Sequence, residues 1–539
     1  MVKKSPENTT PAIVDNVEAL EAKLKSMREA QAKFAEYTQE QVDKIFYEAA
    51  MAANKARIPL AKLAIEETGR GVLEDKVIKN HYAAEYIYNA YKNTKTCGVL
   101  ERDEAYGITK IAEPIGIVGA VIPTTNPTST AIFKTLICLK TRNAIIISPH
   151  PAAAKCTIAA AKLVLDAAVK AGAPEGIIGW VDKPSIELTN MVMRDVDIIL
   201  ATGGPGMVKA AYSSGKPALG VGAGNTPVII DDTADIKLAV NSIIHSKTFD
   251  NGMICASEQA VIVDKEIAKA FEDYMKANNC YFLNKEETEK LTKFMFPDPS
   301  KGVYGPLVGK SANWIAEQAG LKVPEKTKIL IAPISSPDEN HPLAKEKLST
   351  VLAYFVVNSK QQGFDYANKM LELGGLGHSA VIHTGDMKIA DEYGVAMRVG
   401  RIIVNSPSSQ GAIGDIYNTN TPSLTLGCGS YGKNSVSQNV TTVNLINKKR
   451  IAKRRVNMQW FKVPPRIYFE EDSIQYLEKM EGISRAFIVT DPMMVKLGNV
   501  DKVLYYLRKR EEYCHSEIYS DVESDPSVEC IMRGVKAMN

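Results

Sequence analysis

Several features that assign proteins to specialised classes are missing from this sequence. No apolar run approaches the roughly 18 residues that a membrane-spanning helix needs, and Met1–Asn8 contains no apolar core of a signal peptide. The net charge of only +3 over 539 residues provides no attraction for polyanions in general. We therefore expect a cytoplasmic protein with neither membrane nor nucleic acid among its partners.

Cysteine is also scarce, and its spacing is irregular. The eight cysteines form no CxxC pair and no regular series, so neither a disulfide framework nor a zinc site is indicated. What is present, 45% hydrophobic and 24% charged residues, is typical of a soluble globular protein, and the length exceeds that of one ordinary core. The sequence predicts two or three domains, a reducing compartment and no metal site.

The first part of the chain is predicted to be helical and then to change to strand. Residues 15–92 carry apolar residues three and four positions apart, such as Leu20 and Leu24, which is typical of amphipathic helices. The apolar run Lys110–Ile122 then predicts a buried strand that ends in the polar loop Pro123–Thr128. A strand that delivers a polar loop is a common arrangement for a binding site.

The middle of the chain alternates between strand and helix. The pattern predicts helices at 133–139, 152–171 and 186–194 and strands at 144–148, 177–181 and 197–201. Such alternation predicts a parallel, doubly wound sheet, whose ligands bind beyond the carboxyl ends of the strands.

Two glycine-rich segments follow these strands. Thr202–Gly206 stands at a predicted strand end before a helix over 207–212, where backbone N–H groups could approach a dinucleotide. Gly220–Pro227 precedes a predicted strand at 228–231. Neither segment has the GxGxxG spacing, and each alone could be an ordinary turn. Two such segments ahead of one candidate nucleophile are less easily explained by turns.

The candidate nucleophile is Cys255, in the segment Phe249–Glu258. A thiolate attacks a carbonyl far better than a hydroxyl does, and a glycine-containing turn can bring the thiol to backbone amides that lower its pKa and hold an oxyanion. The alternative is that Cys255 is a small buried hydrophobic residue, as most cysteines are. The glycine clusters and the loop that contains Asn126 favour the nucleophile.

From Ser257 to about residue 425 the alternation resumes and predicts a second lobe. Its strands are expected at 260–263, 328–331, 351–357 and 380–382, with a helix at 267–277. The one dense basic run, Lys448–Arg455, is interpreted as a solvated linker rather than a polyanion site. Beyond it, strands at 466–469 and 486–489 and a helix at 503–510 begin a further α/β pattern, in which we expect the strands to lack partners.

Four motifs, taken together and in this order, resemble those of the aldehyde dehydrogenase superfamily: Pro123–Thr128, Ala201–Gly206, Gly220–Pro227 and Phe249–Glu258. From about residue 15 the chain looks like the acylating half of the bifunctional aldehyde-alcohol dehydrogenases, and its tail resembles the start of their iron-dependent alcohol dehydrogenase half. The resemblance implies an α/β, aldehyde dehydrogenase-like fold of two doubly wound Rossmann-type lobes, followed by an incomplete α/β segment. The implied domains are N-terminal helices with an NAD-binding lobe (1–250, completed by part of 425–447), a catalytic lobe (251–424), a basic linker (448–456) and a truncated start of the alcohol dehydrogenase domain (457–539).

The resemblance also implies roles for individual residues. Cys255 stands at the nucleophile, which forms a thiohemiacetal and then a thioester, and Asn126 stands at the oxyanion-hole amide. His378 resembles a histidine near the thiol, and it could equally transfer protons or be structural. Glu346 matches a glutamate that holds the nicotinamide ribose. The implied cofactor-binding residues are Val121, Ile122, Pro123, Thr124, Thr125, Asn126, Gly203, Gly204, Gly222, Glu346 and Leu426.

The implied reaction is the NAD-dependent interconversion of acetaldehyde and acetyl-CoA in fermentation to ethanol. Hydrolytic members of the superfamily carry a glutamate where this chain has Val221. Without a general base, water is a poor deacylating nucleophile, so the thioester can wait for the thiol of coenzyme A.

Two other functions stay open at this stage. One is a hydrolytic aldehyde dehydrogenase, which would need a base that the sequence does not reveal. The other is a non-catalytic filament subunit, since full-length members of the family stack into helical filaments. We expect a homo-oligomer, either a dimer or such a filament. The metal-binding residues of the alcohol dehydrogenase half would lie past Asn539, so we expect no iron and no alcohol dehydrogenase activity.

Overall fold

The computed structural model describes residues 13–298, 302–454 and 463–539, and the chain divides into two compact units, Met1–Lys453 and Arg454–Asn539. The start of the predicted N-terminal lobe (1–12), the end of the predicted linker (455–456) and the start of the predicted tail domain (457–462) lie outside the described residues.

The N-terminal region is helical, as its apolar spacing predicts. α1 begins after Asn16, whose side chain accepts a hydrogen bond from the Ala19 N–H, and it buries Leu20, Leu24 and Met27 on one face. The helices up to the first strand are α1 (Val17–Ala35), α2 (Gln39–Lys55), α3 (Arg57–Thr68), α4 (Leu73–His81) and α5 (Ile87–Tyr91).

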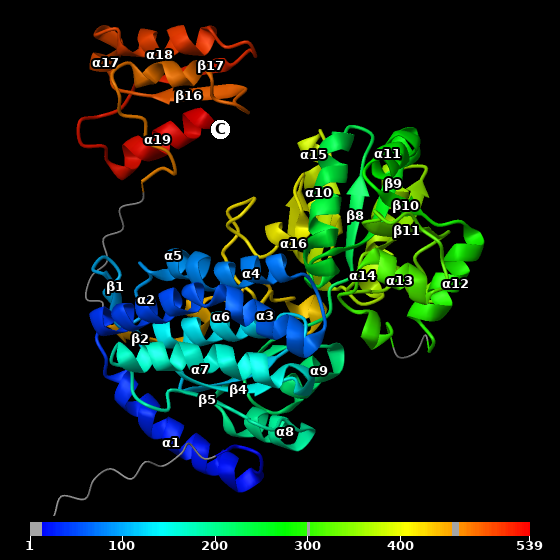
Figure 1. The fold of residues 1–539 in the computed structure, drawn as a ribbon. Coiled ribbons are helices and arrows are strands. Elements are labelled where there is room, and N and C mark those ends of the chain that lie inside the picture. Colours follow the sequence, from blue (N-terminus) through cyan, green and yellow to red (C-terminus); the bar gives the residue numbers. More distant parts are fainter. Residues whose placement is uncertain (1–12, 299–301, 455–462) are drawn as a thin grey trace, which may run out of the picture. The chain divides into compact units, whose positions relative to one another are not determined.

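The first lobe is built on a five-stranded parallel sheet with the order β5-β4-β3-β6-β7. Its strands are β3 (Ile117–Ile122), β4 (Ala144–Pro149), β5 (Ile178–Trp180), β6 (Ile198–Thr202) and β7 (Ala218–Val221). The helices between them are α6 (Pro127–Lys140), α7 (Ala154–Lys170), α8 (Ile186–Asp195) and α9 (Pro205–Ser213). α6 and α7 cover one face and α1 and α8 the other (Figure 1), so the predicted doubly wound sheet is confirmed.

The second lobe is built on a seven-stranded parallel sheet with the order β10-β11-β12-β9-β8-β13-β14. The strands are β8 (Thr226–Ile230), β9 (Glu258–Asp264), β10 (Cys280–Phe282), β11 (Ile329–Pro333), β12 (Val351–Val357), β13 (Gly377–His383) and β14 (Val399–Val404). The helices are α10 (Ile236–Thr248), α11 (Lys265–Ala277), α12 (Lys285–Met295), α13 (Ala312–Gln318), α14 (Lys360–Glu372), α15 (Met387–Ala396) and α16 (Ser408–Gly411).

Successive strand residues in this second sheet serve two separate cores. Val228 and Ile230 of β8 pack in the core that includes Phe271 of α11, whereas Ile229 packs in the core that includes Phe364 of α14.

The predicted lobe boundary at residue 250 is wrong. β8 pairs with β9 and β13 of the second sheet, so the chain crosses to the second lobe between β7 and β8.

The predicted basic linker is also wrong over most of its length. β15 (Ile446–Ala452) pairs antiparallel along the whole of β2 (Ile108–Pro114), which pairs on its other side with β1 (Gly98–Asp103). Only Ile446 of β15 is buried, and the basic side chains that follow face solvent. Backbone hydrogen bonds rather than side-chain burial hold this segment to the first unit.

The second unit contains a parallel pair, β16 (Arg485–Val489) and β17 (His515–Tyr519), with helices α17 (Pro492–Lys496), α18 (Asn499–Arg508) and α19 (Val528–Met538). The expectation that the strand at 486–489 lacks a partner is wrong, because β17 pairs with it. The strand predicted at 466–469 does not form, and Phe469 at its end is 88% exposed.

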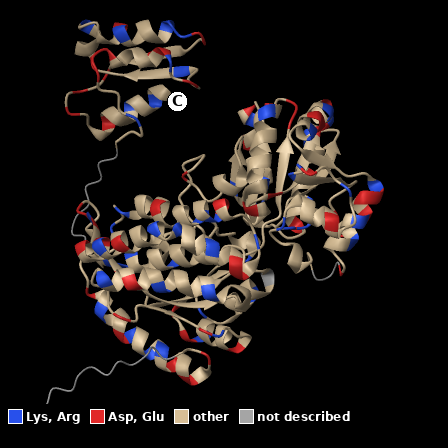
Figure 2. Cartoon of the chain, viewed as in Figure 1, with Lys and Arg blue, Asp and Glu red and all other residues tan. Residues whose placement is uncertain are grey.

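Charges of both signs are interspersed along the outer helices (Figure 2), as the small net charge predicts. Of the helices in the described ranges, none has the length and apolar character required to cross a membrane.

We predict that a chain shortened to end at Lys453 keeps its fold, because the second unit forms a separate compact body. A chain shortened to end at Leu445 loses the whole β15–β2 pairing, in which each backbone hydrogen bond contributes about 0.5–1.5 kcal/mol. Thermal unfolding followed by circular dichroism should give an unchanged Tm for the first-unit transition of the longer variant and a lower one for the shorter. Equal Tm values for the two variants would contradict the role given to β15.

Candidate active site

A cavity of about 580 Å³ lies at the carboxyl ends of the first sheet, where α/β folds bind ligands. Its walls come from the segments that follow β3, β4, β6 and β7, and from Met253–Cys255. The predicted nucleophile, the predicted oxyanion amide and the eleven predicted cofactor-binding residues all line this cavity. Four motifs distant in the sequence therefore meet at one site.

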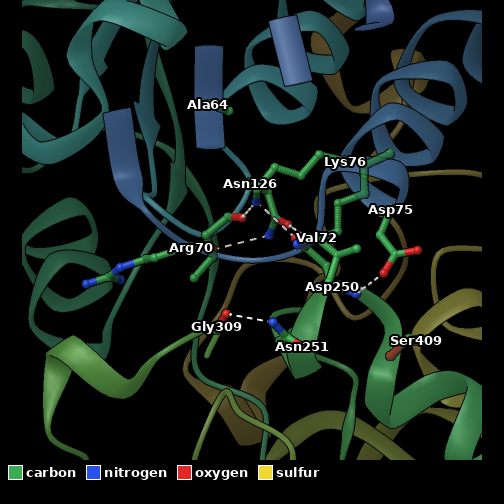
Figure 3. A network of polar contacts seen from close by, with 12 residues as sticks. Ala64, Arg70, Val72, Asp75, Lys76, Asn126, Asp250, Asn251, Gly309 and Ser409 are labelled. Atoms are coloured by element: carbon green, nitrogen blue, oxygen red, sulfur yellow. Dashed lines mark hydrogen bonds and ion pairs between the residues drawn. The ribbon is translucent and has the colours of Figure 1, made fainter. Parts of the chain in front are cut away.

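The turn that leads to Cys255 has an unusual backbone. After α10 ends, Asp250 and Asn251 have φ angles of 49° and 54°, in the left-handed region. A residue other than glycine held there costs on the order of 1–3 kcal/mol, so such a conformation persists only where its surroundings enforce it. Asn251 Nδ2 donates to the Gly309 carbonyl oxygen at 3.0 Å (Figure 3).

The side chain of Asp250 is the centre of a buried charge cluster, part of which Figure 3 shows. Its Oδ1 accepts from the Val72 N–H at 2.8 Å. Its Oδ2 accepts from Lys76 Nζ at 3.0 Å and from Lys79 Nζ. Its backbone N–H donates to Asp75 Oδ2 at 2.7 Å. Asp250 is fully buried and both lysines are nearly so, so the cluster holds the turn in place from within.

Two glycines allow the backbone to pack closely against this turn. A Cβ on Gly71, whose φ is 84°, would lie 2.0 Å from Asp250 Oδ1, and a Cβ on Gly224 would lie 1.8 Å from the Cys255 carbonyl oxygen. Real Cβ atoms do not approach so closely. Both positions therefore require glycine.

Cys255 is the one cysteine of the eight with partial exposure, and all eight lie in the described part of the chain. Burial and, to a smaller extent, the negative charge of Glu346 together raise the pKa of its thiol to about 12, although Arg401 acts in the opposite direction. The expectation that the turn lowers this pKa is therefore wrong. A glycine-containing turn does not outweigh burial beside a carboxylate, so Cys255 rests as the protonated thiol.

Glu346 reaches the cavity from the segment before β12. Its Oε1 accepts from the Gly224 N–H at 3.0 Å, and burial raises the pKa of its carboxyl to about 7. Among the residues that line the cavity, it is the single carboxylate. It therefore changes charge near neutral pH beside the nucleophile.

His378 does not line the cavity. It is fully buried, its Nδ1 lies 3.0 Å from Ser379 Oγ, and its Cε1 would lie 3.3 Å from a Cβ on Gly224. Burial and the charge of Arg401 lower its pKa to about 3, so it is neutral at physiological pH. Proton transfer by His378 stays a prediction.

The residues present fit a dinucleotide. Gly204 is the N-cap of α9, it has no side chain to cap the helix, and a Cβ there would meet no atom within 4 Å. Pro205 has no N–H and the Met207 N–H donates to the Gly204 carbonyl oxygen, so the Gly206 N–H is the group of this first turn that can face an anion such as a pyrophosphate. Gly203, Gly204 and Gly222 all line the cavity.

The sequence reasoning missed Lys76, Lys79 and Asp250. The two lysines lie three residues apart on α4, a spacing that places them on one face, but lysine on a helix is normally solvated. No sequence signal identifies them as buried. Within the described ranges, no three His, Cys, Asp or Glu side chains are grouped so as to hold a metal ion.

Comparison with known proteins gives two family matches. Residues 9–415 match the model described as the aldehyde dehydrogenase family, and residues 464–539 match the iron-containing alcohol dehydrogenase model. The aldehyde-alcohol dehydrogenase of Clostridium acetobutylicum is 52% identical over 98% of this chain and 61% of its own length. The bifunctional aldehyde-alcohol dehydrogenase of Escherichia coli K12 is 50% identical over 98% of this chain and 60% of its own length. The chain thus spans about three fifths of these relatives.

Among solved structures, an acetylating aldehyde dehydrogenase from Geobacillus thermoglucosidasius is 45% identical and superposes with a TM-score of 0.80, covering 82% of this chain and 98% of that one. A propionaldehyde dehydrogenase from Clostridium phytofermentans is 29% identical, with a TM-score of 0.73 over the same shares. These similarities confirm the predicted α/β fold of the first unit.

We predict that Glu346→Gln accelerates alkylation of Cys255 in a pH-dependent way. Below about pH 7 the Glu346 carboxyl is protonated and resembles glutamine, so the two rates should agree. Above about pH 7 the wild-type carboxylate disfavours the thiolate, so the variant should react at least about threefold faster, since the thiolate fraction changes tenfold for each pKa unit. Glutamine keeps an acceptor for the Gly224 N–H. Iodoacetamide labelling of the Cys255 peptide from pH 6 to 9 measures this, and a rate ratio independent of pH would contradict it.

Proposed function

The chain belongs to the aldehyde dehydrogenase family, and from this we propose that it is a CoA-acylating aldehyde dehydrogenase, which converts acetaldehyde, coenzyme A and NAD to acetyl-CoA and NADH, and the reverse. The observation that carries the proposal is a partly exposed thiol, Cys255, in one cavity with an amide donor and an open helix N-terminus. The similarity to an acetylating aldehyde dehydrogenase over 98% of that chain supports it.

Cys255 supplies the nucleophile. Its sulfur attacks the aldehyde carbon, the thiol proton leaves, and the carbonyl oxygen becomes the oxyanion of a thiohemiacetal. Asn126, on the cavity wall, supplies an amide donor for that oxyanion. Since the thiol rests protonated, a base must accept its proton. Cys255 is partly exposed, so solvent can take up this proton.

The cavity would hold NAD along Val121–Asn126, with the pyrophosphate at the N-terminus of α9 and Glu346 toward the nicotinamide ribose. When bound, NAD supplies the acceptor for the hydride that turns the thiohemiacetal into a thioester. The preference for NAD over NADP rests on the family resemblance.

Release of the acyl group by coenzyme A is favoured by the residue at position 221, where hydrolytic members of the superfamily carry a glutamate. Val221 is 98% buried at the end of β7 and presents an aliphatic side chain to the cavity. It cannot deprotonate water. The thiol of coenzyme A is a better nucleophile, so it takes the acyl group and Cys255 is regenerated.

We further propose that the protein works in the cytoplasm as a homo-oligomer, a dimer or a filament. Eight free cysteines support a reducing compartment. The rival functions, a hydrolytic enzyme and a non-catalytic filament subunit, differ from the proposal in their products and in their need for Cys255.

The decisive measurement is NADH formation from acetaldehyde with and without coenzyme A, together with identification of the product. We predict dependence on coenzyme A and formation of acetyl-CoA. Cys255→Ala should lose more than about 99% of turnover, since a covalent nucleophile has no substitute. The matched control is Cys280→Ala, a buried cysteine of β10. Acetate as the main product would favour the hydrolytic alternative, and an active Cys255→Ala would rule out covalent catalysis.

We also predict that Val221→Glu diverts product from acetyl-CoA to acetate. A well-placed general base typically contributes about 10²- to 10⁴-fold, so even a poorly aimed one should raise the acetate fraction about tenfold. Burial raises the pKa of a new carboxyl, so the effect should grow as pH rises to about 8. The control is Val221→Gln, whose side chain has nearly the same shape as that of Val221→Glu but cannot act as a base. If both variants release equal acetate in a folded state, exclusion of water rather than loss of a base explains the specificity.

A further inference from the structure

The amide of Asn126 has a defined orientation. Its Oδ1 accepts from Lys79 Nζ at 2.6 Å, and its Nδ2 donates to Thr125 Oγ1 at 3.2 Å. The two ends of an amide have nearly the same size but opposite hydrogen-bonding character. A rotation of 180° would therefore leave the shape of the site unchanged and present an oxygen where a donor is needed.

Lys79 selects one of these two orientations. An ammonium group is a donor only, so the amide oxygen must face it and the amide nitrogen must face away. Lys79 is itself immobilised, since its Nζ also donates to Asp250 Oδ2 and lies 5.8 Å from the centre of the Phe249 ring. Its side chain is 5% exposed and lines the cavity. Burial lowers its pKa to about 8, so it remains mostly charged at pH 7.

The ammonium group of Lys79 links the two lobes, because it donates both to Asn126 and to Asp250. Asn126 belongs to the loop after β3 of the first sheet, whereas Asp250 belongs to the left-handed turn that delivers Cys255. Figure 3 shows Asn126 and Asp250 on either side of Val72. The donor for the oxyanion and the approach to the nucleophile are thus tied through one nitrogen atom.

We propose that Lys79 is a positioning residue, which orients the Asn126 amide so that its nitrogen faces the oxygen of the reacting carbonyl. This inference rests on the proposed function, in which Asn126 stabilises the oxyanion formed at Cys255. The inference adds to the active site a residue of α4, which lies outside the four sequence motifs.

Lys76 provides a control within the same cluster. It lies one helical turn earlier on α4, is equally buried, and donates to the same Oδ2 of Asp250 at 3.0 Å. Its other acceptor is the Thr125 carbonyl oxygen at 3.5 Å, not the Asn126 side chain. Loss of Lys76 removes the same kind of charge from the same carboxylate without releasing the amide.

The test compares two reactions of Cys255. Acylation by p-nitrophenyl acetate develops an oxyanion, whereas alkylation by iodoacetamide displaces iodide and develops none. The ratio of their rate constants therefore reports the oxyanion donor and cancels changes in thiol exposure or thiolate fraction. Complete loss of one such donor costs about 10²- to 10³-fold.

We expect Lys79→Met to lower the acylation-to-alkylation ratio at least about tenfold, and Lys76→Met to change it less than about threefold. Lys79→Arg, which keeps the charge and can donate to both acceptors, should restore much of the ratio. Asn126→Ala should lower it, and Lys79→Met added to Asn126→Ala should lower it no further. Should Lys79→Met fold poorly because Asp250 loses one of its two ammonium partners, Lys79→Met with Asp250→Asn removes both members of that ion pair and should give the same low ratio.

The outcomes separate the inference from the proposed function. An equal fall in the ratio for Lys76→Met and Lys79→Met would overturn the inference, because Lys79 would then act only through Asp250. A normal ratio in Lys79→Met with a low ratio in Asn126→Ala would overturn it too, while the role of Asn126 stands. A normal ratio in Asn126→Ala would overturn both the inference on Lys79 and the oxyanion role of Asn126. If neither reagent modified Cys255, the proposed function would lose its nucleophile.

Discussion

One buried carboxylate, Asp250, holds together the parts of the site that come from different regions of the chain. It accepts from the Val72 backbone and from two lysines of α4, and it stands in a left-handed conformation five residues before the nucleophile. The two lysines carry the opposing charge, and a buried carboxylate without such partners would be strongly destabilising, by about 3–5 kcal/mol. This ion cluster holds the strained turn and the orientation of the Asn126 amide. It also explains why position 71 must be glycine, since a side chain there would collide with Asp250. Its effect is to fix a backbone geometry that the local sequence alone does not favour.

The fold and the walls of the cavity could be predicted because they depend on local patterns. A parallel strand buried on both faces reads as a continuous apolar run, so the strand predicted at 144–148 corresponds to β4 (Ala144–Pro149), and the one at 351–357 to β12. Polar or glycine-rich segments after such strands gather at one edge of the sheet. Val121–Asn126, Gly203, Gly204 and Gly222 line the cavity for that reason.

What could not be predicted depends on distant partners. Lys79 reads as a solvated helix residue, and only the fold brings it to Asp250. The basic residues of β15 read as a linker because their side chains are exposed, and their pairing with β2 involves the backbone, which has no sequence signature. The turn alone predicts a lowered pKa for the Cys255 thiol, but burial and the carboxylate of the distant residue Glu346 raise that pKa. The strand expected at 466–469 has the right residue types, yet no strand among the described residues pairs with it.

The pairing of β15 with β2 has a consequence for the order in which the chain can fold during synthesis. Asn447 and Pro114, which meet across this pair, are 333 positions apart, whereas every strand of the second sheet lies between Thr226 and Val404. At a ribosomal rate of about 5–20 residues per second, β2 waits on the order of tens of seconds for its partner. The second lobe can therefore assemble as a continuous piece of chain while the lobe that began first is still incomplete. Until β15 emerges, one edge of β2 has unpaired backbone groups, and that edge is where a nascent chain of this protein is most open to wrong pairing with another strand.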